Sequence, residues 1–451
     1  MRSFLAGPCV NVRPGEGFFT LTITYDPSHP KYFDEVDFRA ELERVFDLCH
    51  GCRLCLHLCP SFPTLFNYID SHDGDVAKMS RAESDQVVDE CYQCKLCYVK
   101  CPYIPPHEWD LDFPRLMLRA KSIRKARGEL SKVEEISDKV LANTDLIGAV
   151  SVPLSSLVNK LTDVHSTASR NLMEKGAGIA AERVLPPYAR MRLSTWYKRR
   201  PKPFIAKRKG SVAVYPTCFI EYMEPAIGKA IFGVYERNQI SCTLADKAKC
   251  CGAPHLHAGE VDKFVEAAKR NVEVLDAEVS AGRSIVVAQP TCAYVIKRDY
   301  PLYLKSEKAK RVAENTFDTS EYLVSKYRED REGFDLNFNG SVPSEITYHA
   351  PCHLQAQNIG LKSRDLIKLT GAKIQVVTKC SGIDGTWGYR AKNYALAKRV
   401  SGLLAKAIDK AGPNASLVGD CHLANYAISE ETDRVVSHPM VVMARAYGIE
   451  I

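Results

Sequence analysis

The sequence predicts a protein of two architectures in series, a helical N-terminal part followed by parallel α/β layers. In the N-terminal part, apolar residues recur at helical spacing over residues 37–46, and Ser80 with Glu83 marks the start of a second helix over residues 80–88. In the C-terminal part, short apolar runs alternate with longer amphipathic segments, as in strands joined by crossover helices. We therefore expect an α + α/β fold.

Composition and cysteine usage limit the class of protein. The 451-residue chain is 45% apolar and 25% charged, which is typical of a globular protein with several domains. Its 17 cysteines follow an N-terminus with neither a long apolar core nor a convincing cleavage site. We expect thiols that are free or bound to metal in a reducing compartment, and thus a cytoplasmic protein.

Eight of the cysteines form two copies of the pattern C-x-x-C-x-x-C-x-x-x-C-P. This is the ligand run of bacterial ferredoxins with two [4Fe–4S] clusters, in which the fourth cysteine of each run ligates the other cluster. Zinc sites use paired ligands instead, so zinc or disulfides are the less favoured alternatives. The long interval between the runs favours a helical ferredoxin. The expected ligand sets are Cys49, Cys52, Cys55 and Cys101 for one cluster and Cys91, Cys94, Cys97 and Cys59 for the other.

Shifts in composition divide the chain into five parts. They are an N-terminal arm (1–36, with one possible strand at 17–26), a helical two-cluster ferredoxin domain (37–130), a basic helical linker (131–209), a first α/β domain (210–340) and a second (341–451). Strands are expected at 211–215, 284–288, 345–349, 374–378 and 415–418, and long helices at 221–238, 260–281 and 391–411.

The linker carries an apolar run, residues 146–158, that is too short to span a bilayer. Basic stretches at 119–127 and 190–209 flank it. The region is either a solvated face or an interfacial segment on an anionic membrane surface, with Trp196 and Tyr197 as anchors. The net charge of +7 fits either interpretation, or an acidic partner. No nucleic-acid motif accompanies the charge, so we exclude nucleic acid as a partner.

The remaining cysteines follow the predicted strands in two matching passes. Tyr215-Pro-Thr-Cys218 matches His349-Ala-Pro-Cys352, Lys249-Cys-Cys-Gly252 matches Lys379-Cys-Ser-Gly382, and Gln289-Pro-Thr-Cys292 matches Cys421-His-Leu-Ala424. Because the carboxyl ends of parallel strands form ligand sites, we expect the thiols to gather there.

This pattern resembles the cysteine-rich CCG domain of iron–sulfur oxidoreductases, such as the iron–sulfur subunits of heterodisulfide reductase, glycolate oxidase and anaerobic glycerol-3-phosphate dehydrogenase. The similarity extends from the paired cysteine runs through residues 184–200 and the segments KCCGAPH, HAPCH and GIDGTWG to the terminal DCHLAN. It implies two ferredoxin clusters followed by two CCG domains. It also implies that electrons pass from a partner flavoprotein dehydrogenase to quinone.

The chain departs from the full five-cysteine motif of that family. Gln289 stands where the first half would have a fifth cysteine, and Ser381 and Ala424 replace two in the second half. Four thiols suffice for a further iron–sulfur or metal centre, whereas three need another ligand or simply pack. The candidate ligands are Cys218, Cys250, Cys251 and Cys292 in the first half and Cys352, Cys380 and Cys421 in the second, with His353, His422 or His438 as possible helpers.

The sequence therefore favours an electron-transfer subunit. No G-x-G-x-x-G motif opens a helix, and no flavin or nicotinamide domain is evident, so the substrate chemistry is expected on a partner. Whether the chain is itself an enzyme stays open. The alternatives are a thiol/disulfide or peroxide-linked reductase subunit acting through the CCG module, and a scaffold on the inner face of the cell membrane.

Overall fold

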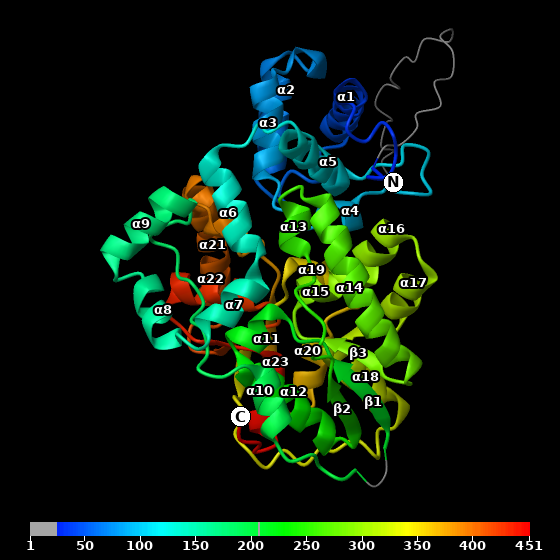
Figure 1. Ribbon diagram of the computed structural model, residues 1–451, viewed down its shortest axis with the longest axis vertical. Coiled ribbons are helices and arrows are strands. Elements are labelled where there is room, and N and C mark those ends of the chain that lie inside the picture. The colour runs from blue at the N-terminus through cyan, green and yellow to red at the C-terminus, as the bar shows by residue number, and fades with distance from the viewer. Residues whose placement is uncertain (1–24, 206–207) are drawn as a thin grey trace, which may run out of the picture.

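The computed structural model describes residues 25–205 and 208–451 (Figure 1). A helical module at the N-terminal end is followed by connecting helices and by two parallel sheets, each with helices around it. The strand expected at 17–26 lies almost entirely outside the described residues.

The N-terminal module is built from short helices around an aromatic core. Phe38, Val45 and Phe46 of the first helix are buried against Phe62 and Phe113, as the helical spacing predicted. Ser80 and Glu83 form the predicted capping box of the third helix. The elements are α1 (Glu35–Cys52), α2 (Ser61–Ser71), η1 (Val76–Lys78), α3 (Arg81–Glu90), α4 (Leu96–Lys100) and α5 (Phe113–Ala126).

Five helices connect this module to the sheets: α6 (Lys132–Ala142), α7 (Thr144–Ser151), α8 (Ser155–Thr162), α9 (Thr167–Ala177) and α10 (Leu193–Arg199). Trp196 and Tyr197 of α10 pack on Phe232 of the first α/β half, with ring centroids 5.7 and 5.1 Å away. These two aromatic residues, which would be the anchors if the segment lay on a membrane surface, therefore pack against the protein's own core.

The first sheet has the order β2-β1-β3-β4 with all pairs parallel. The helix expected at 221–238 is interrupted, because Pro225 disfavours helical backbone at Glu224. The elements are β1 (Gly210–Val214), α11 (Cys218–Tyr222), α12 (Pro225–Arg237), β2 (Ile240–Leu244), α13 (Ala253–His257), α14 (Val261–Ser280), β3 (Ser284–Val287), α15 (Pro290–Tyr294), η2 (Val295–Asp299), α16 (Tyr300–Leu304), α17 (Glu307–Glu314), β4 (Thr316–Asp318) and α18 (Thr319–Glu329).

The second sheet has the corresponding order, β6-β5-β7-β8, and is also parallel throughout. The alternation of strands and crossover helices predicted from the sequence is thus confirmed. The elements are β5 (Glu345–His349), α19 (Cys352–Ala356), α20 (Lys362–Lys368), β6 (Lys373–Val377), η3 (Trp387–Tyr389), α21 (Ala391–Ala411), β7 (Ser416–Gly419), α22 (His422–Thr432), β8 (Val436–Ser437) and α23 (Pro439–Ala446).

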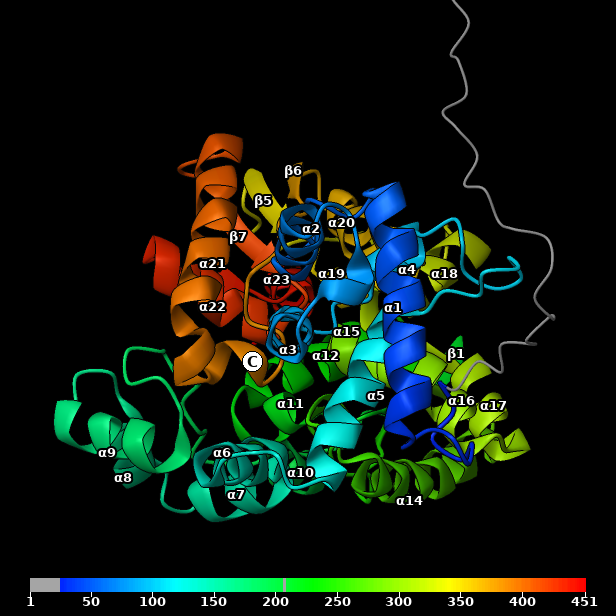
Figure 2. The ribbon, with the colours of Figure 1, turned by 90° about the horizontal axis from the view of Figure 1, so that it is seen from above.

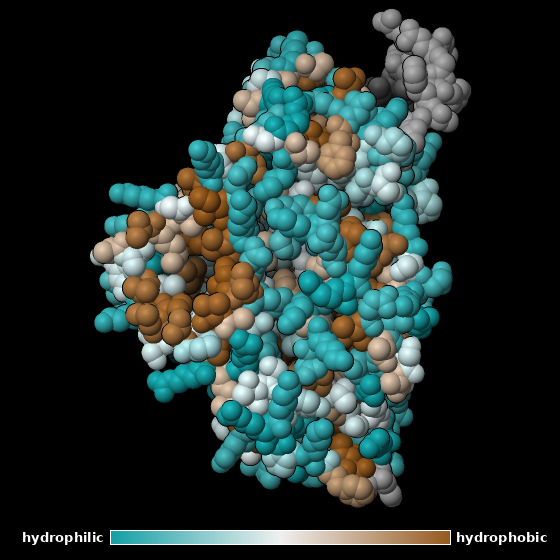
Figure 3. Space-filling model, in the orientation of Figure 1, coloured by the Kyte–Doolittle hydropathy of each residue, from teal (hydrophilic) through white to brown (hydrophobic). Residues whose placement is uncertain are grey.

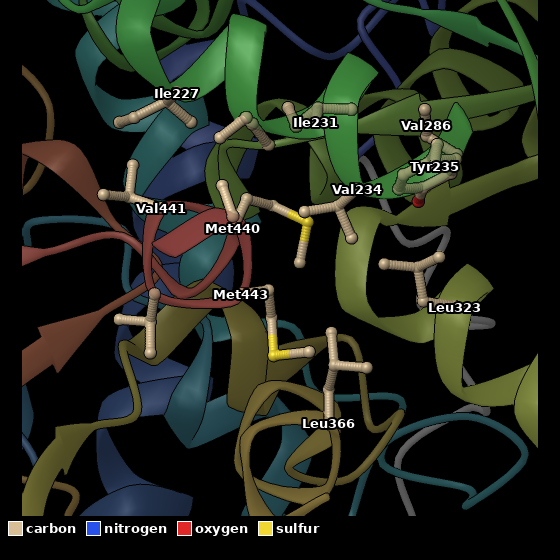
Figure 4. Close-up of a cluster of buried hydrophobic side chains, with 14 of the residues drawn as sticks. Ile227, Ile231, Val234, Tyr235, Val286, Leu323, Leu366, Met440, Val441 and Met443 are labelled. Atoms are coloured by element: carbon tan, nitrogen blue, oxygen red, sulfur yellow. The ribbon is translucent and has the colours of Figure 1, made fainter. Parts of the chain in front are cut away.

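The two α/β halves share one hydrophobic core. Met440 and Met443 of the C-terminal helix α23 lie among Ile231 and Val234 of α12 and Leu366 of α20 (Figure 4). Seen from above, the N-terminal module lies over both halves (Figure 2), with α4 against α19 and α5 against α13. This docking brings the ferredoxin-type cysteines next to the strand ends of the second half.

Candidate functional site

The first cysteine run contributes three thiols to a small cavity beside α1. Its volume is about 30 Å³, and an apolar wall that includes Phe62 completes it. Two of the thiols lie in the last turns of α1 and a third in the turn after it, where Arg53 adopts a left-handed conformation. The fourth sulfur arrives from the end of α4. The cysteines are Cys49, Cys52, Cys55 and Cys101.

The second run contributes three thiols to a neighbouring cavity of about 10 Å³. Gln93 stabilises this loop, because its side-chain amide donates to the carbonyl of Pro114 at 3.0 Å and contacts the sulfur of Cys91 at 3.5 Å. Phe62 lines both this cavity and the first. The cysteines are Cys59, Cys91, Cys94 and Cys97. The sequence predicted this group of four as the ligands of one cluster. That they bind iron stays a prediction.

The chemistry of these two cavities fits a [4Fe–4S] cluster. Each offers four sulfur donors and otherwise mainly apolar walls, and cubanes are held by four cysteine thiolates. Burial, reinforced by the neighbouring thiols, raises the pKa of Cys49 and of Cys97. A positively charged metal core would stabilise the thiolates and lower these pKa values. Among the described residues, no three Cys, His, Asp or Glu side chains converge as a single metal ion requires. The thiolates of a cube bind different irons and need no such convergence.

The first α/β half gathers four thiols at the carboxyl ends of its strands. Cys218 follows β1, Cys250 and Cys251 follow β2, and Cys292 follows β3. Hydrogen bonding to Cys218 and Cys251 lowers the pKa of Cys250, whereas the same contacts raise the pKa of those two neighbours. The backbone N–H of Cys250 also donates to Asp145 of the connecting helices at 2.7 Å. Four thiols that lie so close together are a suitable donor set for a multi-iron cluster, whose thiolates bind different irons.

The second half places its three thiols around a larger cavity of about 630 Å³. Cys59 of the ferredoxin-type module lines the same cavity, as do Ser381 and Ala424, which replace the missing cysteines. The N–H of Gly382 donates to the sulfur of Cys380 at 3.3 Å. The three thiols are Cys352, Cys380 and Cys421.

Two of the three histidines considered as helper ligands are hydrogen-bonded through both ring nitrogens. His353 accepts at Nδ1 from the Thr291 hydroxyl at 2.9 Å and donates from Nε2 to the carbonyl of Gln93 at 2.9 Å. His438 accepts from the N–H of Met440 and donates to the carbonyl of Ala288. These two side chains tie the parts of the molecule together and leave no lone pair for a metal. The sequence did not indicate this role.

His422 is held differently, by the residue that replaces the fifth cysteine. Its Nδ1 pairs with the side-chain oxygen of Gln289, and the amide nitrogen of Gln289 donates to the sulfur of Cys421 at 3.2 Å. The Nε2 of His422 is buried without a hydrogen-bond partner among the described residues. Gln289 thus acts across the interface between the halves.

The connecting helices expose an apolar patch. Its members are Leu146, Val150, Leu154, Leu157, Leu161 and Leu172, each about half or more exposed. The space-filling view shows apolar residues gathered over α7–α9 (Figure 3). In the part of the chain that the structure describes, no helix is long and apolar enough to cross a membrane.

Sequence comparisons agree with this arrangement. The profile of the 4Fe-4S dicluster domain matches residues 41–102, and that of the CCG cysteine-rich domain matches residues 212–297. The dicluster match spans both cysteine runs, and the CCG match spans the four thiols of the first α/β half. The two matches thus identify a 4Fe-4S dicluster domain followed by a CCG cysteine-rich domain within this chain.

The chain is homologous to two proteins named as subunits of redox enzymes and to a lactate utilization protein. It is 28% identical to one of the subunits of the anaerobic glycerol-3-phosphate dehydrogenase of Escherichia coli, over 72% of this chain and 81% of the relative. It is 24% identical to lactate utilization protein A of Bacillus pumilus, over 47% of this chain and 87% of that protein. It is 25% identical to one of the subunits of the fumarate reductase (CoM/CoB) of Methanothermobacter marburgensis, over 40% of this chain and 35% of the relative.

Proposed function

We propose that the chain relays electrons from a flavoprotein dehydrogenase to quinone. The observation that carries the proposal is a row of adjoining cavities. The cavity of Cys49 shares the wall residue Phe62 with the cavity of Cys59, and Cys59 in turn lines the large cavity of the second half. Thiols thus run continuously from the outer end of the helical module to the strand ends of the second half.

The eight cysteines of the two runs would hold two [4Fe–4S] clusters, which supply reversible one-electron transfer. The protein's contribution is to fix their order and surroundings. Phe62 forms an apolar wall of the first two cavities, and Gln93 holds the backbone around Cys91. The thiols Cys218, Cys250, Cys251 and Cys292 would hold a further centre.

The partner carries the substrate chemistry in this proposal. Two of the relatives are named as subunits of a dehydrogenase and of a reductase, which supports a redox partner for this chain as well. The sequence has no G-x-G-x-x-G motif that opens a helix, and thus no recognisable site for a nicotinamide or flavin cofactor that would accept a hydride.

The apolar patch on α7–α9 favours attachment to the inner face of the cell membrane. Lys160, Lys175 and Arg190 are exposed near it in the sequence and would meet anionic headgroups. The patch would then bury its leucines at the boundary between headgroups and acyl chains.

Anaerobic purification from the native host tests the relay. We expect about eight irons per chain from the two runs alone, and a flavoprotein that co-purifies. Far less iron in freshly prepared protein, with no paramagnetic signal on reduction, contradicts the two-cluster assignment. A co-purifying diiron peroxide reductase would indicate a peroxide-linked role instead.

The alternative is a reductase in which the CCG thiols themselves react, and the lowered pKa of Cys250 is the observation in its favour. Replacing Cys250 and Cys251 with Ser separates the two functions. Loss of turnover with an unchanged cluster spectrum supports direct thiol chemistry, whereas loss of a cluster signal supports the relay.

A further inference from the structure

The large cavity between the helical module and the second α/β half is more than a cluster site. Its volume of about 630 Å³ compares with about 30 and 10 Å³ for the two cavities that each offer four thiols. Small-molecule sites typically enclose about 300–1,000 Å³. The cavity therefore has room for an organic ligand beside its three thiols.

Its walls combine apolar side chains with polar and charged ones, including Lys100, Lys379 and Asp384, and its rim is accessible. Leu56, Leu58 and Leu96 line it from the helical module, and Leu403 of α21 lines it from the second half with 59% of its surface exposed. Such walls suit a ligand with an apolar body and a few polar groups.

Two buried polar groups in these walls lack partners among the described residues. The Nε2 of His349 donates to the carbonyl of Lys379 at 3.0 Å, which leaves its buried Nδ1 as an acceptor without a donor. The Tyr92 hydroxyl is buried and makes no hydrogen bond of regular geometry; its polar neighbours are the weakly accepting sulfurs of Cys380, Cys59 and Cys94. Both side chains are 2% exposed. An unpartnered buried polar group is costly unless a ligand satisfies it.

These two groups define complementary chemistry for a ligand. The ligand must accept a hydrogen bond from Tyr92 and donate one to His349. A quinol does both through its ring hydroxyls, whereas a disulfide has no hydrogen to donate. Tyr92 and Cys59 also line the cavity of the second cysteine run, so a ligand here is separated from that run by a single wall.

We propose that this cavity binds a quinone and its quinol, with the Tyr92 hydroxyl donating to one ring oxygen and His349 Nδ1 accepting from the other. The proposal rests on the relay proposed above and gives its acceptor a place. Each ring oxygen of the quinone gains one electron and one proton on reduction. The electrons come from oxidation of the partner's organic substrate, and the protons come from water at the rim.

Calorimetric titration of the anaerobically purified protein with the quinol analogue heptyl-hydroxyquinoline N-oxide tests the site. Tyr92→Phe removes the donor, and His349→Leu removes the ring nitrogen that acts as the acceptor. We expect each to weaken binding roughly ten-fold. Tyr389→Phe is the matched control, because its hydroxyl is equally buried and unpartnered but lies outside the cavity lining.

The outcomes for the site and for the relay are separable, because iron content and the spectrum of the reduced clusters are measured on the same samples. Protein with its full iron complement that fails to bind the analogue, or that binds it equally well in both cavity variants, overturns the site and leaves the relay standing. Binding of glutathione disulfide in place of the analogue overturns the site in favour of the reductase alternative. A shortage of iron with intact binding contradicts the relay instead.

Discussion

The side-chain nitrogen of Gln289 lies 3.2 Å from the sulfur of Cys421, which belongs to the other α/β half. Its side-chain oxygen accepts from the backbone N–H of His422 and pairs with the ring of the same residue. All three side chains are buried. The residue that occupies the position of a fifth cysteine in the first half therefore organises the cysteine of the second.

We predict that Gln289→Leu destabilises the interface between the halves. Leucine has a similar size but leaves the N–H groups of His422 without an acceptor, at a cost of about 1–3 kcal/mol per buried group. Chemical unfolding of the anaerobic protein measures the change. Gln375→Leu, at an exposed position of β6, is the control and should shift the free energy of unfolding by less than about 0.5 kcal/mol. Equal shifts for the two variants would show that the contact across the interface contributes nothing.

The grouping of the eight cysteines predicts which substitutions are equivalent. Cys101→Ser should remove the same cluster signal as Cys49→Ser, because both sulfurs line one cavity although they belong to different runs. Cys59→Ser should instead match Cys91→Ser. Electron paramagnetic resonance of the reduced variants and an iron content lowered by about four per chain provide the measurement. If Cys101→Ser instead reproduces the spectrum of Cys91→Ser, each run holds its own cluster.

Membrane attachment should depend on the apolar patch. Leu157→Glu together with Leu161→Glu places charge on residues that are 56% and 48% exposed, so the fold should be unaffected. Burying the exposed half of each leucine at a bilayer surface contributes roughly 1 kcal/mol, and the double variant should bind anionic vesicles at least ten-fold more weakly. Leu336→Glu, at a leucine that is 45% exposed elsewhere, is the matched control in flotation assays. Wild-type protein that stays in solution with anionic vesicles at low salt would exclude this attachment.

Arg183 is predicted to hold the connecting segment to the second half. Its guanidinium is buried, donates to the carbonyl of Gly388 at 3.0 Å and pairs with Glu430 at 3.1 Å. Arg183→Met leaves the Glu430 carboxylate buried with fewer partners and should destabilise the protein by about 3 kcal/mol. Arg183→Lys should restore only part of the lost stability, because an ammonium cannot reproduce both contacts of the planar guanidinium group. A thermal midpoint unchanged in both variants would rule out this role.

Much of the fold follows from local patterns in the sequence. The period of apolar residues, the Ser80–Glu83 capping box and the alternation of strands with helices all appear in the structure. Three edge strands, β2, β4 and β8, were not predicted. β4 and β8 are runs of three and two residues, which are too short to show a period. β2 has five residues whose burial alternates along the strand, so its pattern could have been recognised from the sequence. The interruption between α11 and α12 could have been predicted, since Pro225 restricts the backbone of the residue that precedes it.

The candidate sites were predictable only as far as spacing determines them. The positions of the cysteines after strands and within runs gave their grouping in space. The hydrogen bonds of Gln289, His353 and His438 depend on how the two halves and the helical module dock, which no local pattern encodes. The unpartnered groups of Tyr92 and His349 were hidden for the same reason.

The pH dependence of stability should carry a contribution from His438. Burial lowers its pKa to about 4 from the ordinary 6.5. Between these values the unfolded chain holds a proton that the folded protein excludes, so the free energy of unfolding is complete above about pH 6.5 and falls as the pH drops towards 4. The full difference corresponds to about 3 kcal/mol. Asparagine at this position caps a helix well and does not titrate, so His438→Asn should flatten the loss of stability.

The comparison with wild type isolates His438 together with its electrostatic effect on His422, whose ring stacks on it at 5.4 Å and whose pKa is also lowered, chiefly by burial. His349 and His353 are also buried with pKa values lowered to about 4, so they add slope of the same sign to both proteins. Chemical unfolding at pH 7, 6 and 5 should give a difference between the two proteins that shrinks as the pH falls. Curves that stay parallel over this range would mean that His438 binds its proton equally well in the folded and unfolded chain.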